Sequence, residues 1–487
     1  MKRYLTTPIY YANGAPHLGH AYTTLVADCY RRFYRLQGDD VLLISGTDEH
    51  GQKIERAAAA SGIDIERFVF ERSEGFQRLW AALDIEIDRF ERTTDEHHKE
   101  VARAFWQRLV DNGDVYPGRY EGLYCVECEQ YFTAGEFCEV HRRPLERFSE
   151  PTWFFRLSAY KERLIDHIEA HPKFILPVAR RNEVLAVLKS DALNDLSISR
   201  TSTCWGVPVP GDSEHVMYVW IDALVSYLSA LGDLDSERLG EYWADTIHFI
   251  GKDILIFHCV YWPAFLLSAR LPLPKSIIAN GWLTVEGRKI SKSDPETIID
   301  PGALANTIGS DGLRYYLLRS VTLGNDVDFS REQVIRVLNT DLANNLGNLV
   351  SRFVRLLATR YPEGFECDVD SLTGDALVLV KETRRCADEI REAIDGGDPA
   401  RAVRCFIRTC SVINAWIQQH ELWALPDGEE LRRGLWIVYQ AIADLTIPGW
   451  CLVPGTTEKI RDALVLGPPS WRQIGVRHRH VRAVSIP

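Results

Sequence analysis

Asn-Gly-Ala-Pro-His-Leu-Gly-His-Ala, at residues 13–21, separates two runs of different periodicity. Residues 4–11 before it are rich in β-branched and aromatic side chains, which predicts a short strand. Residues 21–36 after it carry an apolar stripe at helical spacing, formed by Leu25, Cys29, Phe33 and Leu36. The Asn-Gly pair and Pro16 break the chain between the two runs. The stretch therefore predicts the first strand, turn and helix of an α/β domain.

Two imidazoles, His17 and His20, stand at the beginning of this predicted helix. Free amide N–H groups and the positive end of the helix dipole face outward there, so the position suits a phosphate group. Gly19 between them lets a bulky ligand approach the backbone closely. The spacing alone is equally compatible with two histidines that only cap the helix.

The composition is that of a large globular protein. With 487 residues, of which 46% are hydrophobic and 25% charged, the chain has length for about three domains. A net charge of −12 argues against broad, non-specific nucleic-acid binding but allows a local basic surface that binds one RNA. The 11 cysteines fit a reducing cytoplasm better than a disulfide framework. We expect no signal peptide and no membrane contact, because the most apolar stretch, 254–271, is short and interrupted by polar residues.

A second predicted turn, Gly-Thr-Asp-Glu-His-Gly at 46–51, follows a buried strand at 41–45. Ligands of open α/β sheets bind at the carboxyl ends of the strands, so this turn should lie beside the first one. Its carboxylate, Asp48, could hold a substrate ammonium group. It could equally cap the helix that follows.

Residues 115–200 interrupt the α/β pattern and are predicted to be an insertion. Cys125-Val-Glu-Cys128 and Cys138-Glu-Val-His141 supply two ligand pairs with nine residues between them. Four such ligands close a tetrahedral zinc site without an open position, which predicts a structural ion. Free thiols or a metal-free knuckle are the alternative.

The α/β character returns after residue 200. The expected elements are a strand at 217–221, a helix at 222–231, a strand at 247–251 that leads into Lys252-Asp253, and a helix carrying Phe257, His258, Tyr261 and Trp262. Trp220, Ala223 and Tyr227 fall at spacings that share one helical face. Taken singly, each of these aromatic residues is better explained as core.

Arg-Lys-Ile-Ser-Lys-Ser, at 288–293, follows a strand-like run at 277–285 and contains Lys289 and Lys292. A basic loop suits a nucleoside triphosphate, whose charge must be neutralised as the α-phosphate is attacked. A solvated basic turn is the usual alternative. The basic loop alone is a weak motif, but its combination with His-x-x-His is specific.

From residue 330 onward the pattern is nearly all helical, with helices expected at 332–357, 374–394, 399–420 and 429–445. The first has an apolar seam of Leu338, Leu342, Leu346, Leu349 and Phe353 and an opposite polar stripe of Asp341, Asn345, Asn348 and Arg352. Such a stripe is most often a solvated face. Asn348 and Arg352, together with Trp423 in a later loop, could instead read unstacked bases.

The predicted fold class is α/β, a Rossmann-like parallel-sheet catalytic domain split by a zinc-binding insertion and followed by a helical bundle. The expected boundaries are 1–114 and 201–283 for the two catalytic halves, 115–200 for the insertion, 284–329 for the basic loop and linker, 330–455 for the bundle, and 456–487 for a tail that packs back on the catalytic half.

These motifs together resemble the methionyl-tRNA synthetase family of class I aminoacyl-tRNA synthetases, over essentially the whole chain. His17-Leu-Gly-His20 and Lys289-Ile-Ser-Lys-Ser293 are similar to the two class I motifs. The methionine branch is indicated by Thr-Pro-Ile-Tyr-Tyr-Ala-Asn-Gly at 7–14, Gly-Thr-Asp-Glu-His-Gly at 46–51, Tyr-Val-Trp-Ile-Asp-Ala at 218–223, Gly-Lys-Asp-Ile at 251–254 with Phe257-His258, Asn-Leu-Val-Ser-Arg at 348–352, and Trp423.

The resemblance implies activation of L-methionine by ATP to methionyl-adenylate, followed by transfer to tRNA(Met). The methionine side chain would be lined by Ile9, Tyr11, Trp220, Ala223, Tyr227 and His258, and Asp48 would hold the amino group. The nucleotide would be bound by His17, Gly19, His20, Gly251 and Asp253, with Lys292 and Lys289 stabilising the phosphate charge. The CAU anticodon would be read by Asn348, Arg352 and Trp423.

The resemblance further implies Mg²⁺ with the ATP, one structural Zn²⁺ at Cys125, Cys128, Cys138 and His141, and a monomeric, cytoplasmic enzyme. The insertion has no room for the hydrolytic editing domain found in relatives that activate isoleucine, valine or leucine. The chain departs from the family at Asp294-Pro295-Glu296, usually Leu-Gly-Asn, at Leu422, often proline, and at Pro448-Gly449-Trp450. The alternative is a paralogue that forms an aminoacyl-adenylate for an acceptor other than tRNA.

Overall fold

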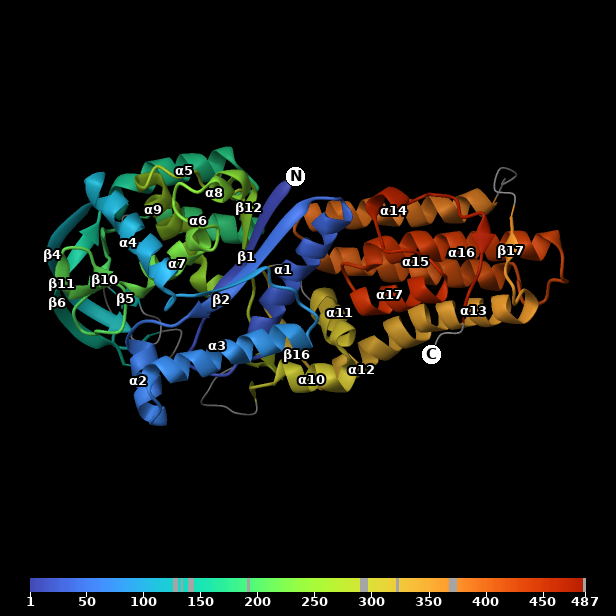
Figure 1. Ribbon diagram of the computed structural model, residues 1–487, viewed down its shortest axis with the longest axis horizontal. Coiled ribbons are helices and arrows are strands. Elements are labelled where there is room, and N and C mark those ends of the chain that lie inside the picture. Colours follow the sequence, from blue (N-terminus) through green and yellow to red (C-terminus); the bar gives the residue numbers. More distant parts are fainter. Residues whose placement is uncertain are drawn as a thin grey trace.

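The structure is a computed structural model that describes residues 1–125, 130–132, 135–138, 144–190, 193–289, 297–320, 324–367 and 375–484. Figure 1 shows an α/β part, coloured blue to yellow, beside a bundle of long helices, coloured orange to red. This arrangement confirms the predicted fold class.

A parallel sheet forms the centre of the α/β part, with the strand order β3-β2-β1-β12-β13-β7. Its strands are β1 (Lys2–Tyr11), β2 (Asp40–Asp48), β3 (Arg89–Arg92), β7 (Ile175–Leu176), β12 (Thr246–Gly251) and β13 (Ser276–Asn280). β1 pairs with β2 on one side and with β12 on the other, so the chain winds outward in both directions from the β1–β12 pair. Open sheets bind ligands beyond the carboxyl ends of the strands at such a point.

Helices cover this sheet: α1 (Leu18–Leu36), α2 (Gln52–Ser61), α3 (Ile65–Ala82), α4 (Glu96–Asp111), α7 (Val219–Ser229), α8 (Glu237–Tyr242) and, after a π-helical turn at Phe257–Tyr261, α9 (Trp262–Ser268). The strand expected at 217–221 is wrong, because β11 (Asp212–Met217) ends there and α7 begins at Val219. All of α7 is buried, and a short buried apolar run has no periodicity that separates strand from helix.

The range 115–200 contributes strands to three sheets. β5 (Gln130–Phe132), β4 (Val115–Cys125), β6 (Glu146–Phe155) and β8 (Leu196–Ser197) form an antiparallel sheet, and β10 (Pro208–Val209), β11 and β9 (Ser199–Arg200) form a smaller one. Between them, α5 (Lys161–Ala170) and α6 (Val178–Lys189) flank β7, which pairs with β13 of the main sheet. The boundary at residue 200 stays a prediction.

The link to the bundle contains β14 (Leu283–Val285), β15 (Arg288–Lys289), β16 (Val327–Phe329), α10 (Pro301–Ile308) and α11 (Ser310–Ser320). The bundle contains α12 (Arg331–Val337), a π-helical segment (Leu338–Gly347), α13 (Asn348–Arg360), α14 (Asp375–Asp395), α15 (Pro399–Gln419), α16 (Glu429–Gly449) and α17 (Pro454–Ala463). All four helices expected from the sequence are present, and α17 was not expected.

The predicted polar stripe of the first bundle helix is in part an internal contact. Asp341 accepts hydrogen bonds from Tyr315 at 2.8 Å and Arg319 at 2.6 Å, and Asn345 donates to Ser411 at 2.8 Å. Asn348, one turn beyond Asn345, is exposed. The stripe is therefore solvated only towards its C-terminal end.

The C-terminal tail contacts both parts of the protein. The ring of Trp471 meets Phe33 of α1 edge-on, with 5.6 Å between the ring centroids. Further on, β18 (His480–Val481) pairs with β17 (Phe365–Glu366), and Trp436 of α16 donates to the carbonyl of His478 at 2.6 Å. The tail thus lies on the bundle as well as on α1.

Candidate active site

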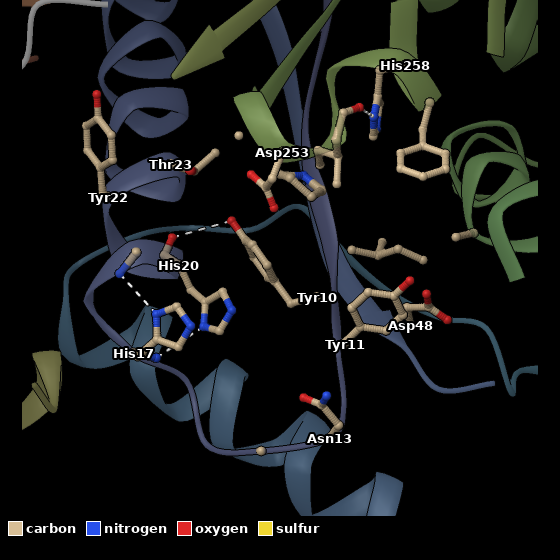
Figure 2. Close-up of a pocket in the computed structure, with 18 of the residues that line it drawn as sticks. Tyr10, Tyr11, Asn13, His17, His20, Tyr22, Thr23, Asp48, Asp253 and His258 are labelled. Carbon is tan, nitrogen blue, oxygen red and sulfur yellow. Dashed lines mark hydrogen bonds between the residues drawn. The ribbon is translucent and has the colours of Figure 1, made fainter. Parts of the chain in front are cut away.

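A cavity of about 430 Å³ opens at the carboxyl ends of β1 and β12. Every described residue that the sequence predicted for the amino-acid and nucleotide sites lines it: Ile9, Tyr11, His17, Gly19, His20, Asp48, Trp220, Ala223, Tyr227, Gly251, Asp253 and His258. Figure 2 shows the two histidines and Asp48 on opposite sides of this cavity. Segments separated by more than two hundred residues therefore meet at one place.

His17 and His20 cap the N-terminus of α1 reciprocally. Nδ1 of His17 accepts from the backbone N–H of Gly19 at 3.2 Å, and Nδ1 of His20 accepts from the backbone N–H of His17 at 3.1 Å. The two rings are stacked with their centroids 3.7 Å apart. Because each Nδ1 is an acceptor, each neutral ring carries its proton on Nε2.

The histidines therefore both cap the helix and line the cavity, so the two interpretations of the motif are compatible. Gly19 makes the stack possible, because a Cβ there would lie 3.1 Å from Cε1 of His17. The helix N-terminus and two Nε2–H donors together suit an anionic ligand.

Aromatic rings form the opposite end of the cavity. Trp220 and Phe257 stack with their centroids 3.7 Å apart and their planes inclined by 7°, and Tyr11 meets Trp220 nearly edge-on. Asp48, at the end of β2, is only 3% exposed. This end therefore combines an apolar slot with one buried carboxylate.

A hydrogen-bond chain fixes the protonation of His258. Its Nδ1 lies 3.0 Å from the carbonyl of Ile254 and must donate to it, so its Nε2 accepts from the Tyr227 hydroxyl at 2.8 Å. Burial lowers the pKa of His258 to about 4, and burial raises the pKa of Tyr227. Both groups are neutral at pH 7.

The side of the cavity that the sequence predicted for the nucleotide includes Gly251 and Asp253 at the end of β12. A Cβ on Gly251 would lie 2.4 Å from Oδ1 of Asp253, so a larger residue there would displace this carboxylate. Of the basic loop, Lys292 lies outside the described residues, and Lys289 is described only as part of β15. Gly281, Trp282 and Leu283 line the cavity where β13 leads into β14, and β14 pairs with β15, so the basic loop starts close to the cavity wall.

Several lining residues were not among the site residues predicted from the sequence, for example Tyr10, Lys53 and Trp282. Tyr10 stacks on Phe76 and lies 4.8 Å from His20 between ring centroids. Trp282 follows the carboxyl end of β13, and the rule that ligands bind there could have identified it. Nothing in the local pattern distinguishes Tyr10 or Lys53.

The predicted zinc ligands are only partly within the described residues. Cys125, at the end of β4, and Cys138 are both buried, whereas Cys128 and His141 lie outside. The described residues contain no group of three or more potential metal ligands. With two of four positions outside, the zinc site stays a prediction.

Two of the three residues predicted for base recognition are in contact. Cζ of Arg352, on α13, lies 5.4 Å from the ring centroid of Trp423, which is 42% exposed in the connection between α15 and α16. Asn348 is one helical turn before Arg352 and is also exposed. Leu422 is buried against α16, where Gly434 leaves room for it, and this leaves the indole of Trp423 at the surface.

No helix in the described part of the chain is long and apolar enough to cross a membrane.

Comparison with known proteins gives one consistent result. The family model described as class I tRNA synthetases (M) matches residues 3–141 and 137–354. The methionine–tRNA ligase of Rickettsia felis is 40% identical over 95% of this chain and 91% of its own length. The methionine–tRNA ligase of Thermotoga maritima is 41% identical over 94% of this chain and 75% of its own length.

Solved structures agree. The methionyl-tRNA synthetase of Mycobacterium tuberculosis in complex with methionyl-adenylate superposes with a TM-score of 0.96 and 39% identity, covering 100% of this chain and 99% of that chain. The apo form of the same enzyme superposes with a TM-score of 0.88.

Proposed function

Because the chain belongs to the methionyl-tRNA synthetase family, we propose that its cavity binds L-methionine and ATP side by side and joins them as methionyl-adenylate. The enzyme then transfers the methionyl group to tRNA(Met). The observation that carries this proposal is the meeting of the His17–His20 pair, Asp48 and the aromatic slot in one cavity.

The aromatic end of the cavity receives the amino acid. Trp220, Phe257 and Tyr227 offer polarizable faces, which suit a flexible thioether side chain. Asp48 pairs with the α-ammonium group, and the low polarity around it strengthens this pair. The neutral His258–Tyr227 pair places no net charge against the thioether.

The other end receives the nucleotide. His17 and His20 donate from Nε2 to phosphate oxygens, at a helix N-terminus that favours negative charge. The methionine carboxylate attacks the α-phosphate, and the bond to the leaving pyrophosphate breaks. Lys289 and Lys292 neutralise the charge that grows on the phosphates, which is typically worth about 3 kcal/mol per preorganised donor.

Two metal ions belong to the proposal. Mg²⁺ would accompany ATP and supply charge neutralisation on the phosphates. Cys125, Cys128, Cys138 and His141 would hold a structural Zn²⁺, and the burial of both described cysteines fits thiolate ligands in a closed site.

Asn348, Arg352 and Trp423 would read the CAU anticodon, since amide, guanidinium and indole groups there are close together and accessible.

The test is ATP–pyrophosphate exchange with each of the twenty amino acids, followed by charging of initiator and elongator tRNA(Met). We expect exchange with methionine and charging of both tRNAs. Lys292→Ala should lose most of the exchange, whereas Lys275→Ala, at an exposed ion pair with Asp245, should retain it. Exchange without charging would indicate an acceptor other than tRNA.

A further inference from the structure

A buried polar chain lies behind the α7 wall of the cavity. Trp220, Ala223 and Tyr227 of α7 line the cavity, and Asp222 faces a different way. Oδ2 of Asp222 lies 2.8 Å from Nδ1 of His50, and Oδ1 lies 2.8 Å from Nε2 of His98 on α4. One carboxylate thus ties α7 to the segment after β2 and to α4.

The chain continues on the far side of His98. Nδ1 of His98 lies 2.9 Å from Oγ of Ser229, and this oxygen lies 2.6 Å from Oε1 of Glu91 on β3. Exposure is 1% for Asp222 and Glu91 and 0% for His98 and Ser229, so water does not share these bonds. A continuous row of hydrogen bonds therefore runs from Asp222 through His98 and Ser229 to Glu91.

This row of hydrogen-bonded side chains contains more hydrogen bonds than its neutral groups have protons to donate. Its three short contacts, Asp222 to His98, His98 to Ser229 and Ser229 to Glu91, each need one proton. Two ionised carboxylates supply none, a neutral imidazole supplies one, and a hydroxyl supplies one. One further proton must therefore reside on one of these four side chains.

The charged neighbours decide where this proton lies. Nε of Arg89 donates to the other oxygen of Glu91 at 2.7 Å, which favours an ionised Glu91. Burial alone would raise the pKa of Asp222, but His50 and His98 outweigh it and hold that pKa well below its usual range. His98 is the remaining position for the proton.

We propose that His98 is held doubly protonated between Asp222 and Glu91, and that it is a positioning residue that fixes the α7 wall of the amino-acid pocket. The charges of Asp222, Glu91, His98 and Arg89 then sum to zero, so this ionic cluster is balanced. Its kinetic consequence rests on the proposed function. The protonation state does not.

The first experiment is imidazole ¹⁵N NMR of the full chain with labelled histidine. The spectrum contains 14 histidines, and the signals lost in His98→Gln assign His98. We expect both ring nitrogens of His98 to carry protons at pH 7.5. One unprotonated nitrogen there would overturn the proposal, whether or not the protein activates methionine.

The second experiment is pyrophosphate exchange by His98→Gln. We expect at least a tenfold higher KM for methionine and a KM for ATP within twofold, because α7 faces the amino-acid end. The matched control is His97→Gln, at the neighbouring position, whose side chain is 39% exposed and which should change neither constant.

Ser229→Ala supplies a second variant if His98→Gln does not fold. It removes the hydroxyl that joins His98 to Glu91, and it should raise the KM for methionine in the same direction. An unchanged KM for methionine in a folded variant would overturn the positioning role. A wild-type protein without methionine-dependent exchange would instead contradict the proposed function and leave the NMR result standing.

Discussion

The hydroxyl of Tyr227 lies 2.8 Å from Nε2 of His258, and the other nitrogen of that ring is bonded to the carbonyl of Ile254. The Tyr227 hydroxyl therefore donates its proton to the hydrogen bond with Nε2 of His258. What the hydroxyl presents to the cavity is an oxygen lone pair, and the imidazole is held in one tautomer. Both residues act as a unit in shaping the aromatic end of the cavity.

Tyr227→Phe should therefore weaken methionine binding. The variant leaves Nε2 of His258 without the hydroxyl that fixes the ring. We expect this loss, about 1–3 kcal/mol, to fall on the complex with methionine, where it corresponds to a rise in KM for methionine of roughly 5- to 150-fold. Tyr4→Phe is the matched control, since the Tyr4 hydroxyl is also buried and bonds the carbonyl of Tyr227 at 2.9 Å outside the cavity. Equal effects of the two variants on KM would contradict the prediction.

His258 should also make stability depend on pH. Its pKa is about 4 in the folded protein because burial disfavours the charged form, against 6.5 in the unfolded chain. As the pH falls below 6.5, His258 is protonated in the unfolded chain but stays neutral in the folded protein. The free energy of unfolding therefore decreases as the pH is lowered from 6.5 to about 4.

Urea unfolding of the wild type and His258→Gln at pH 7.5 and 5.0 measures this contribution. The wild type should lose about 2 kcal/mol more than the variant between these two values. The pKa of buried His248 is lowered first by burial and then by His258, and the burial part is common to both proteins. An identical loss in both proteins would refute the prediction.

A buried carboxylate joins the catalytic sheet to the segment that leads into the bundle. Asp28 on α1 lies 2.6 Å from Nη2 of Arg314 on α11 and 2.8 Å from Nε of Arg32, and Asp28 and Arg314 are both 0% exposed. Asp28→Ala leaves the buried guanidinium of Arg314 without its carboxylate partner, whereas Arg32 keeps its ion pair with Asp84, and it should cost about 3–5 kcal/mol in the free energy of unfolding.

Glu71→Ala provides the comparison for Asp28→Ala. It removes an ion pair with Arg67 on the surface of α3, at 2.8 Å, and should leave the free energy of unfolding nearly unchanged. Chemical denaturation of both variants gives the two values directly. A loss below 1 kcal/mol for Asp28→Ala would show that the charge cluster is relieved by water or rearrangement.

The sequence predicted which turns meet at the cavity, because one rule links the carboxyl ends of parallel strands to ligand binding. Parallel strands end at a common edge, so the turns after β1, β2 and β12 had to meet, and the structure brings His20, Asp48 and Asp253 to one cavity. It predicted poorly where burial is complete, as for α7, because an element buried on all sides has no periodic pattern.

Other features depend on contacts that no local pattern encodes. The π-helical turn at Phe257–Tyr261 sets the direction of His258, and the partners of His98 come from α7 and β3, far away in the chain. Such networks are determined by tertiary packing, and residues that supply them look like ordinary polar residues in the sequence.

Variants at the predicted anticodon surface should separate the two steps of the reaction. Trp423→Ala removes a stacking surface worth about 1–3 kcal/mol, so kcat/KM for tRNA(Met) should fall roughly 5- to 150-fold while pyrophosphate exchange stays unchanged. Arg352→Ala should act in the same way, and Arg355→Ala, exposed one turn further along α13, is its charge-matched control. A parallel loss of exchange would instead indicate a structural defect.

Removal of zinc should unfold one part of the insertion and leave the rest. The β4–β6 ladder runs from the Val115–Phe155 pair to the Tyr124–Glu146 pair, so both ends of the segment after Cys125 are anchored without the metal. Cys125→Ser should therefore lower the zinc content of the purified protein from one ion per chain to none and expose new protease sites only between residues 126 and 145. Cys204→Ser, at an exposed cysteine elsewhere, should change neither property. One zinc ion per chain in Cys125→Ser, or no zinc in the wild type, would rule out the four-ligand site. Protease cleavage that extends into β6 would show that the metal supports the whole antiparallel sheet.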